Sequence, residues 1–252
     1  MNYTAAMKSI VGTREEQQDC ACYQVDGARV FAVVCDGMGG LESGKTASLA
    51  TITKLRELYE QKDPVEPFSA FFLSSVDILD ELVHHLKDKN GQRLGAGTTL
   101  VAAAIEADRL FWLSVGDSRL YILRGTEFVQ ATRDHNYFLR LDQMKQENEI
   151  GEREYRSEAT RGEALISFIG MGGIEVMDIN HTPFSLQPND TILLTTDGLY
   201  KALNDEEIAR CLALPDTEQA AGALIDTVNQ KARTAQDNTT CIIIKCNEGG
   251  PA

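Results

Sequence analysis

The order of strand-like and helix-like patterns limits the folds open to this chain. Apolar runs follow one another directly, and the first two are joined by Asp26-Gly27, a pair suited to a two-residue hairpin turn. The predicted strands span residues 20–25, 29–35, 98–105, 109–115, 119–124, 127–130, 191–196 and 239–245. The predicted helices span residues 43–60, 68–87, 204–213 and 217–233. Because hairpins are grouped apart from helix pairs, we expect an α+β fold with antiparallel sheets covered by helices, not a parallel wound sheet.

Length and charge set further limits. With 252 residues, 43% of them hydrophobic, the chain can bury a sizeable core, and we expect one domain over residues 1–252. The 24 Lys and Arg residues against 38 Asp and Glu residues give a formal net charge of -14, which argues against nucleic-acid or membrane partners. The sequence has no basic leader before an apolar run and no apolar run approaching the roughly 18 residues of a membrane span. We therefore expect a cytoplasmic protein.

Several aspartates stand where predicted strands end. Asp36 and Asp197 each close an apolar run and are each followed by glycine, while Asp117 lies between two predicted strands and Asp237 precedes the last one. An aspartate beside glycine or asparagine is usually a turn residue. Four of them at strand ends instead favour a shared site in which carboxylate oxygens bind a hard cation.

An acidic stretch at residues 142–163 differs from the rest of the chain. It is crowded with Asp and Glu, contains several Lys and Arg, and has few large apolar residues. Such a segment leaves the core and is either a plain surface insertion or a mobile flap near the site. Composition alone leaves both alternatives open.

Seven short motifs follow one another along the chain. They are Arg14-Glu15-Glu16-Gln17-Gln18-Asp19, DGMGG at Asp36 to Gly40, GTTL at Gly97 to Leu100, VGDSRLY at Val115 to Tyr121, DH at Asp134 and His135, TDGL at Thr196 to Leu199, and DNTT at Asp237 to Thr240. This series resembles the ordered motifs of the metal-dependent serine/threonine protein phosphatases, the PPM or type 2C family, in its compact bacterial form. The match covers most of the chain, and an ordered series is far more specific than a lone Asp-Gly pair.

The resemblance implies a fold and a metal centre. The fold would be a sandwich of two antiparallel sheets flanked by helix pairs, with a flap at about residues 142–163 and a binuclear Mn²⁺ or Mg²⁺ site at one end. By this similarity Asp36 bridges both ions, the Gly37 carbonyl completes one of them, and Asp197 and Asp237 hold the other. Oxygen ligands suit Mn²⁺ or Mg²⁺, and the motifs contain little histidine or cysteine for zinc. A water bridging the two ions would attack phosphorus in line.

Three more residues receive roles from the resemblance. Arg14 would clamp the phosphate, since its planar fork binds two oxygens and stays charged. Asp19 would orient metal-bound water. Asp117, with Asp197, would hold a weaker third ion. The alternatives are a surface arginine that caps a loop and an ordinary turn aspartate.

The sequence departs from the family pattern at two positions. Gln17 stands where relatives usually have asparagine, which leaves the hydrogen bonding of that turn open. Met38 stands where many eukaryotic members have a histidine that is a candidate general acid, so the leaving-group proton must come from elsewhere. Residues 164–170 follow the pattern only loosely.

The predicted function is metal-dependent hydrolysis of phosphoserine and phosphothreonine in proteins, opposing a bacterial serine/threonine kinase. One alternative is a catalytically silent member of the fold that acts as a scaffold or binding module. Another is a phosphatase for small molecules. Retention of Asp36, Asp197 and Asp237 argues against silence, because clustered carboxylates repel one another unless cations bind them.

Overall fold

Two antiparallel sheets form the centre of the computed structural model, which describes residues 1–40 and 43–248. The first has the strand order β1-β12-β11-β7-β8, and the second runs β10-β6-β5-β3-β2, with β4 paired to β3 and β9 to β6. The strands of the first are β1 Asn2–Ile10, β7 Arg119–Arg124, β8 Glu127–Gln130, β11 Thr191–Thr195 and β12 Thr239–Asn247. Those of the second are β2 Asp19–Asp26, β3 Arg29–Met38, β4 Gly97–Thr98, β5 Leu100–Glu106, β6 Arg109–Val115, β9 Asp178–Ile179 and β10 Phe184–Ser185.

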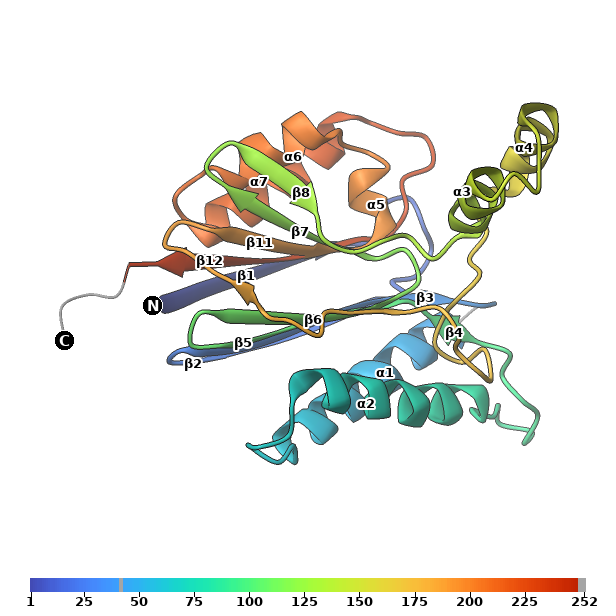
Figure 1. Ribbon diagram of the computed structural model, residues 1–252, viewed down its shortest axis with the longest axis horizontal. Helices are drawn as coiled ribbons and strands as arrows, with labels where there is room; N and C mark the ends of the chain where they lie inside the picture. The colour runs from blue at the N-terminus through green and yellow to red at the C-terminus, as the bar shows by residue number, and fades with distance from the viewer. Residues whose placement is uncertain (41–42, 249–252) are drawn as a thin grey trace.

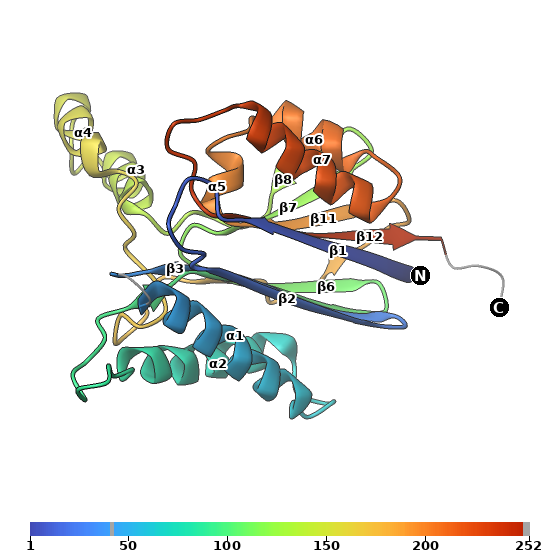
Figure 2. The same ribbon diagram turned by 180° about the vertical axis from the view of Figure 1, so that it is seen from behind.

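Helices cover the outer faces of the two sheets (Figures 1 and 2). The pair α1 Ser43–Glu60 and α2 Phe68–His84 packs on the second sheet, and α6 Asp205–Leu212 and α7 Thr217–Gln230 pack on the first. The remaining helices are α3 Tyr137–Gln146, α4 Glu152–Glu158, the 3₁₀ turn Ala159–Arg161 and α5 Asp197–Tyr200. This arrangement confirms the predicted α+β sandwich flanked by helix pairs.

The apolar residues of β3 explain why the layers stack in this way. Phe31, Val33 and Cys35 pack against α1 and α2. Val30 and Val34, on the other side of the strand, join the core between the two sheets. Since side chains alternate between the faces of a strand, a strand buried on both faces is an unbroken apolar run. The end of that run, at Asp36, therefore lies at the edge of the core.

The N-terminal strand and the end of α2 differ from the sequence prediction. β1 was missed because most of its side chains are exposed and its pattern is weak. Nine backbone pairs with β12, from Asn2 with Asn247 to Ile10 with Thr239, hold it in the sheet. The prediction that the second helix continues to residue 87 was wrong, because α2 ends at His84 and residue 87 pairs with residue 93 in an isolated bridge.

The acidic segment forms a helical hairpin that projects from one end of the sandwich (Figure 1). The two helices meet where the Tyr155 hydroxyl donates to Asp142 over 2.8 Å and Lys145 pairs with Glu152 over 2.8 Å. Leu141 is the one residue of α3 that is buried, and α4 buries none. The hairpin therefore contributes little to the core. Its side chains are held mainly by polar contacts.

Among the described residues, the structure has no helix long and apolar enough to cross a membrane. Residues 41–42 and 249–252, which the single-domain prediction includes, lie outside the described residues.

Candidate active site

Asp36 lies at the end of β3, where its backbone is fixed by the neighbouring threonines. Its N–H donates to Thr99 Oγ1 over 2.9 Å, and its carbonyl accepts from Thr98 Oγ1 over 2.8 Å. The β2–β3 register places Asp19 directly opposite Asp36. Two carboxylates thus face each other at one edge of the second sheet. The sequence alone assigned no role to the GTTL motif, and the structure shows that its two threonines support the backbone of Asp36.

Gly37 allows the start of α1 to approach the end of β3. A Cβ atom on Gly37 would clash with the backbone carbonyl of Gly44, and one on Gly44 would lie 2.8 Å from the Gly37 carbonyl oxygen. Only glycine, which has no Cβ atom, allows two backbone segments to approach each other this closely. The close approach places the Gly37 carbonyl beside Asp36, at the mouth of the cleft.

The first sheet supplies Asp197 and Asp237 at the same end of the molecule. Asp197 begins α5 directly after β11, and Asp237 precedes β12. Thr196 joins the two sheets, since its hydroxyl donates to Asp19 Oδ2 over 2.9 Å and accepts from the Thr240 N–H over 3.0 Å. Asp197 and Asp237 follow Asp36 by 161 and 201 residues in the sequence, and packing of the two sheets brings the segments that carry them to one end of the molecule.

A cleft of about 590 Å³ lies beside Asp36 and Asp237. Its walls include Arg14, Asp36, Gly37, Met38 and Asp237. The Arg14 guanidinium donates to Asp237 Oδ2 over 2.5 Å, and its side chain is 61% exposed. The predicted phosphate clamp is therefore accessible to a ligand in the cleft and lies beside a predicted metal ligand.

Burial and mutual repulsion shift the acidity of the carboxylates. Burial, followed by the charges of Asp19 and Asp197, raises the pKa of Asp36 well above its usual value. Burial also raises the pKa of Asp19 to about 7, against hydrogen bonds from Thr240 and Thr196. For Asp117, burial and then the charge of Asp197 raise the pKa to about 6. Such shifts identify groups whose charge lacks a partner.

The donor set fits a hard divalent cation. Asp19 Oδ1 and Asp197 Oδ1 are buried and accept no hydrogen bond from the described residues. The other oxygen of Asp197, Oδ2, is paired with Lys201 over 2.8 Å, and Asp237 is paired with Arg14. Within the described part of the chain, no three acidic, histidine or cysteine side chains already converge as a complete set of ligands. Unpartnered carboxylate oxygens are the ligands that Mn²⁺ and Mg²⁺ prefer.

Asp117 lies on the loop between β6 and β7, and its side chain is buried. The Tyr200 hydroxyl donates to its carbonyl over 3.0 Å, and the next residue, Ser118, shares a 2.6 Å hydrogen bond with Thr99. These contacts connect Asp117 to both α5 and the backbone support of Asp36. It is therefore close enough to Asp197 for their charges to interact.

Asn238 is a functional residue that the sequence analysis did not single out. Its Oδ1 accepts from the Gln18 N–H over 2.7 Å, while its Nδ2 donates to the carbonyls of Val11 and Glu16 over 2.8 and 2.9 Å. These bonds hold the loop that carries Arg14. The signal was present in the DNTT motif, where an amide that both donates and accepts can fix a loop.

Gln17 replaces the family asparagine without leaving the turn unsupported. Its Nε2 donates to Ser9 Oγ over 2.7 Å and to the Ile10 carbonyl over 3.1 Å. Its Oε1 accepts from the Asp19 N–H over 3.1 Å. The longer side chain therefore ties the turn to β1.

A model of the family described as protein phosphatase 2C matches residues 10–236. The chain belongs to the protein phosphatase 2C family. Among its relatives, the protein phosphatase PhpP of Streptococcus pneumoniae is 29% identical over 243 residues, which cover 93% of this chain and 94% of PhpP. Membership in this family and the similarity to serine/threonine protein phosphatases confirm the predicted enzyme class.

Solved structures of two phosphatases share the fold. The S. agalactiae serine/threonine phosphatase superposes with a TM-score of 0.83 at 24% identity, covering 97% of this chain and 100% of that one. The catalytic domain of PstP, a serine/threonine phosphatase of Mycobacterium tuberculosis, was solved with two manganese ions. It superposes with a TM-score of 0.73 at 24% identity over 98% of this chain and 99% of that one.

Proposed function

We propose that this phosphatase hydrolyses phosphoserine and phosphothreonine in proteins with the help of two Mn²⁺ or Mg²⁺ ions. One observation carries the proposal most directly: Asp36 from the second sheet and Asp237 from the start of β12 line a cleft that contains an exposed arginine. Buried carboxylate oxygens of Asp19 and Asp197, at the same end of the two sheets, accept no hydrogen bond from the described residues. The PstP structure contains two manganese ions, which supports both the number and the kind of metal ion in the proposal.

In the proposed site, the residues that would hold the two ions are Asp36, the Gly37 carbonyl, Asp197 and Asp237. When bound, the ions supply an acidified water and offset charge on the phosphoryl oxygens. Asp19, fixed by the hydroxyl of Thr196, orients water at the site. Binding of the ions would release Asp237 from Arg14, because the same carboxylate serves both.

Arg14 then binds the substrate phosphoryl group through two parallel N–H···O contacts. Asn238 supports the loop on which it lies, and so sets the distance between the guanidinium and Asp36. Met38 lines the cleft but cannot transfer a proton. We propose that Asp117 and Asp197 would hold a third, weaker ion, which would supply an acidic water as a proton donor.

The physiological setting follows the family resemblance. We propose that the substrates are products of a serine/threonine kinase in bacterial signalling, and that the enzyme acts in the cytoplasm without nucleic-acid or membrane partners. The hairpin of α3 and α4 is proposed as a flap that selects substrates, since it projects at the active-site end of the sandwich (Figure 2).

A metal-dependence assay tests this function. Chelator should abolish turnover of a phosphothreonine peptide, and adding Mn²⁺ or Mg²⁺ should restore it. Nucleotide and sugar phosphates, measured in parallel, should be poorer substrates. Undiminished peptide turnover after verified metal removal would contradict the mechanism. Complete inactivity with Mn²⁺ would favour the silent-scaffold alternative, and a preference for small phosphates would favour a small-molecule phosphatase.

A further inference from the structure

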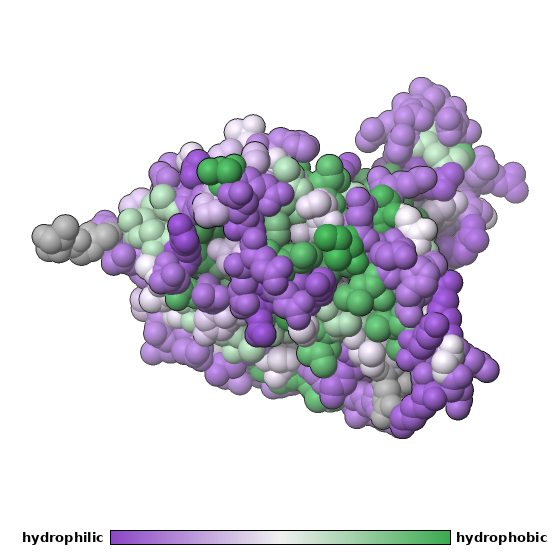
Figure 3. Space-filling view, turned by 90° about the horizontal axis from the view of Figure 1, so that it is seen from below, coloured by the Kyte–Doolittle hydropathy of each residue, from purple (hydrophilic) through white to green (hydrophobic). Residues whose placement is uncertain are grey.

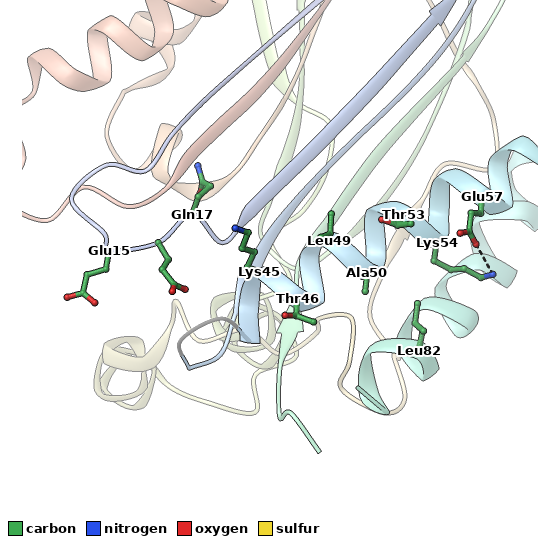
Figure 4. A pocket seen from close by; sticks show the side chains of 11 residues that line it. Glu15, Gln17, Lys45, Thr46, Leu49, Ala50, Thr53, Lys54, Glu57 and Leu82 are labelled. Carbon is green, nitrogen blue, oxygen red and sulfur yellow. Dashed lines mark hydrogen bonds and ion pairs between the residues drawn. The ribbon is translucent and has the colours of Figure 1, made fainter. Parts of the chain in front are cut away.

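A second hollow lies directly beside the catalytic cleft, along the outer side of α1 (Figure 4). We call it the α1 groove. It has a volume of about 880 Å³, and its lining includes Glu15, Lys45, Leu49, Glu57 and Leu82. The side chain of Leu49 is 53% exposed and that of Leu82 37% exposed. Two leucines that face solvent within one groove are available for contact with another molecule.

The α1 groove adjoins the active site. Glu15 and Glu16 line both the catalytic cleft and the groove, and they directly follow Arg14 in the chain. A polypeptide with its phosphorylated residue at Arg14 can therefore reach the groove within a few residues. The occupant that this geometry favours is the substrate chain itself.

The length of the groove sets the length of chain it can hold. Its lining on α1 extends from Lys45 to Glu57. Twelve residues of α-helix rise about 18 Å, which an extended peptide covers in about five residues. The groove can thus contact a flank of roughly five residues on one side of the phosphorylated residue.

The chemistry of the lining defines the flank it would accept. Leu49 and Leu82 offer apolar contact, whereas the charged lining consists of three glutamates and two lysines. Lys54 is paired with Glu57 over 3.2 Å, and Glu15 lies at the catalytic end of the groove. A negative balance, on a protein of net charge -14, attracts a basic side chain.

We propose that the α1 groove binds the segment of the phosphoprotein substrate that flanks the phosphorylated residue. A basic side chain lies near Glu15, and an apolar side chain packs on Leu49 and Leu82. The inference rests on the proposed function, because it assigns a specificity site to the same reaction. It identifies the substrate class as phosphoproteins with a basic and apolar flank.

The same face of the molecule offers a matched control. Figure 3 shows apolar side chains among polar ones on the face where α1 and α2 lie. Leu73 of α2 is 52% exposed, as Leu49 is, but it does not line the groove. If any new charge on this face lowers peptide hydrolysis, glutamate at either leucine will do so. If the loss depends on the α1 groove, only the substitution of Leu49 will show it.

The experiment compares three substrates with the Mn²⁺-loaded enzyme. They are an aryl phosphate, a short phosphothreonine peptide, and phosphothreonine peptides extended by six residues on either side with one basic and one apolar residue. For the wild type, kcat/KM should increase on extension of one side. We expect this gain to be about tenfold and Leu49→Glu to remove it, with kcat/KM for the aryl phosphate and the short peptide unchanged. Leu82→Ala should reduce the gain in the same direction, and Leu73→Glu should change none of the values.

Several results would overturn the inference. These are equal kcat/KM for short and extended peptides, equal losses for Leu49→Glu and Leu73→Glu, or a loss for Leu49→Glu that includes the aryl phosphate. Thermal melts of each variant identify any unfolding. Failure of the proposed function looks different, since the wild type would then hydrolyse neither peptide at any length.

Discussion

At the scale of single residues, Arg14 has one partner in the structure and a different one in the proposed reaction. In the structure it is paired with Asp237, and this hydrogen bond raises the pKa of a guanidinium that is already always charged. During turnover it would bind phosphate, while Asp237 would bind a cation. The ion pair therefore holds Arg14 and Asp237 close to the positions in which they would bind the phosphate and the cation.

Substitution of Arg14 tests whether the fork geometry or the charge matters. Arg14→Lys keeps the charge but loses the planar fork that presents two parallel N–H donors, so we expect KM to increase about tenfold and kcat to change less than threefold. Steady-state kinetics on a phosphothreonine peptide measure both. Unchanged kinetics would refute the clamp.

Asp117 offers a residue-level test of the proton source. Asp117→Asn should lower kcat for a phosphothreonine peptide, whose leaving group needs a proton, and should largely spare an aryl phosphate, whose leaving group does not. Calorimetric titration with Mn²⁺ should still detect the two tighter ions. A uniform loss on both substrates would remove the proton-donor role.

At the scale of elements, the α3–α4 hairpin is separable from the core. Its inner end is fixed where the chain at Gly162 passes against the ring of Phe138, so closely that a Cβ there would clash. Its outer half is held by exposed polar pairs, which contribute little to the free energy of unfolding. The hairpin can therefore change in sequence or be shortened without loss of the fold.

A shortened hairpin tests the flap. Replacing residues 143–154 with a short glycine-serine linker joins Asp142 to Tyr155, whose side chains already meet. We expect the order of preference among phosphopeptides to change, with kcat/KM for an aryl phosphate kept within about twofold. If selectivity over a peptide panel is unchanged, the segment is a plain surface insertion and not a flap.

At the scale of the whole molecule, the two sheets meet at a repulsive cluster of carboxylates. Burial raises the pKa values of Asp36, Asp19 and Asp117, so the folded metal-free protein binds more protons than the unfolded chain near neutral pH. Asp178 acts in the opposite sense. Burial alone would raise its pKa, but the nearby imidazole of His135 and hydrogen bonds from Arg133 lower it, so its contribution is lost only in acid.

These shifts predict the pH dependence of metal-free stability. The contribution of a carboxyl with a raised pKa is complete below its unfolded value, near 4, and is lost as pH rises through its folded value. With Asp117 at about 6 and Asp19 at about 7, the melting temperature in chelator should fall between pH 5 and pH 8. Mn²⁺ should raise the melting temperature most at pH 8.

Thermal melts at four pH values, with chelator and with Mn²⁺, check this expectation. Asp36→Asn removes one charge from the cluster and should flatten the trend in chelator while abolishing turnover. A melting temperature that rises toward pH 8 in chelator would contradict the assignment of these carboxylates to a metal site.

Local sequence patterns determined much of the protein. The turn signal at Asp26-Gly27 predicted the β2–β3 hairpin, although the two turn residues are Gly27 and Ala28 because Asp26 pairs with Arg29. The register of this hairpin places Asp19 opposite Asp36. Apolar periodicity identified the helix pairs, and an aspartate after an apolar run marked Asp36 and Asp197. These features depend on neighbouring residues, because backbone preference and side-chain alternation act over a few positions.

Only the tertiary structure decided the rest. β1 is a strand because nine pairs with β12 hold it, and its own exposed, mixed sequence shows no such preference. Asn238 supports the Arg14 loop, and the α1 groove exists because that loop packs beside α1. Such contacts join segments far apart in sequence, so their free energy comes from burial and hydrogen bonding between partners that no local pattern pairs.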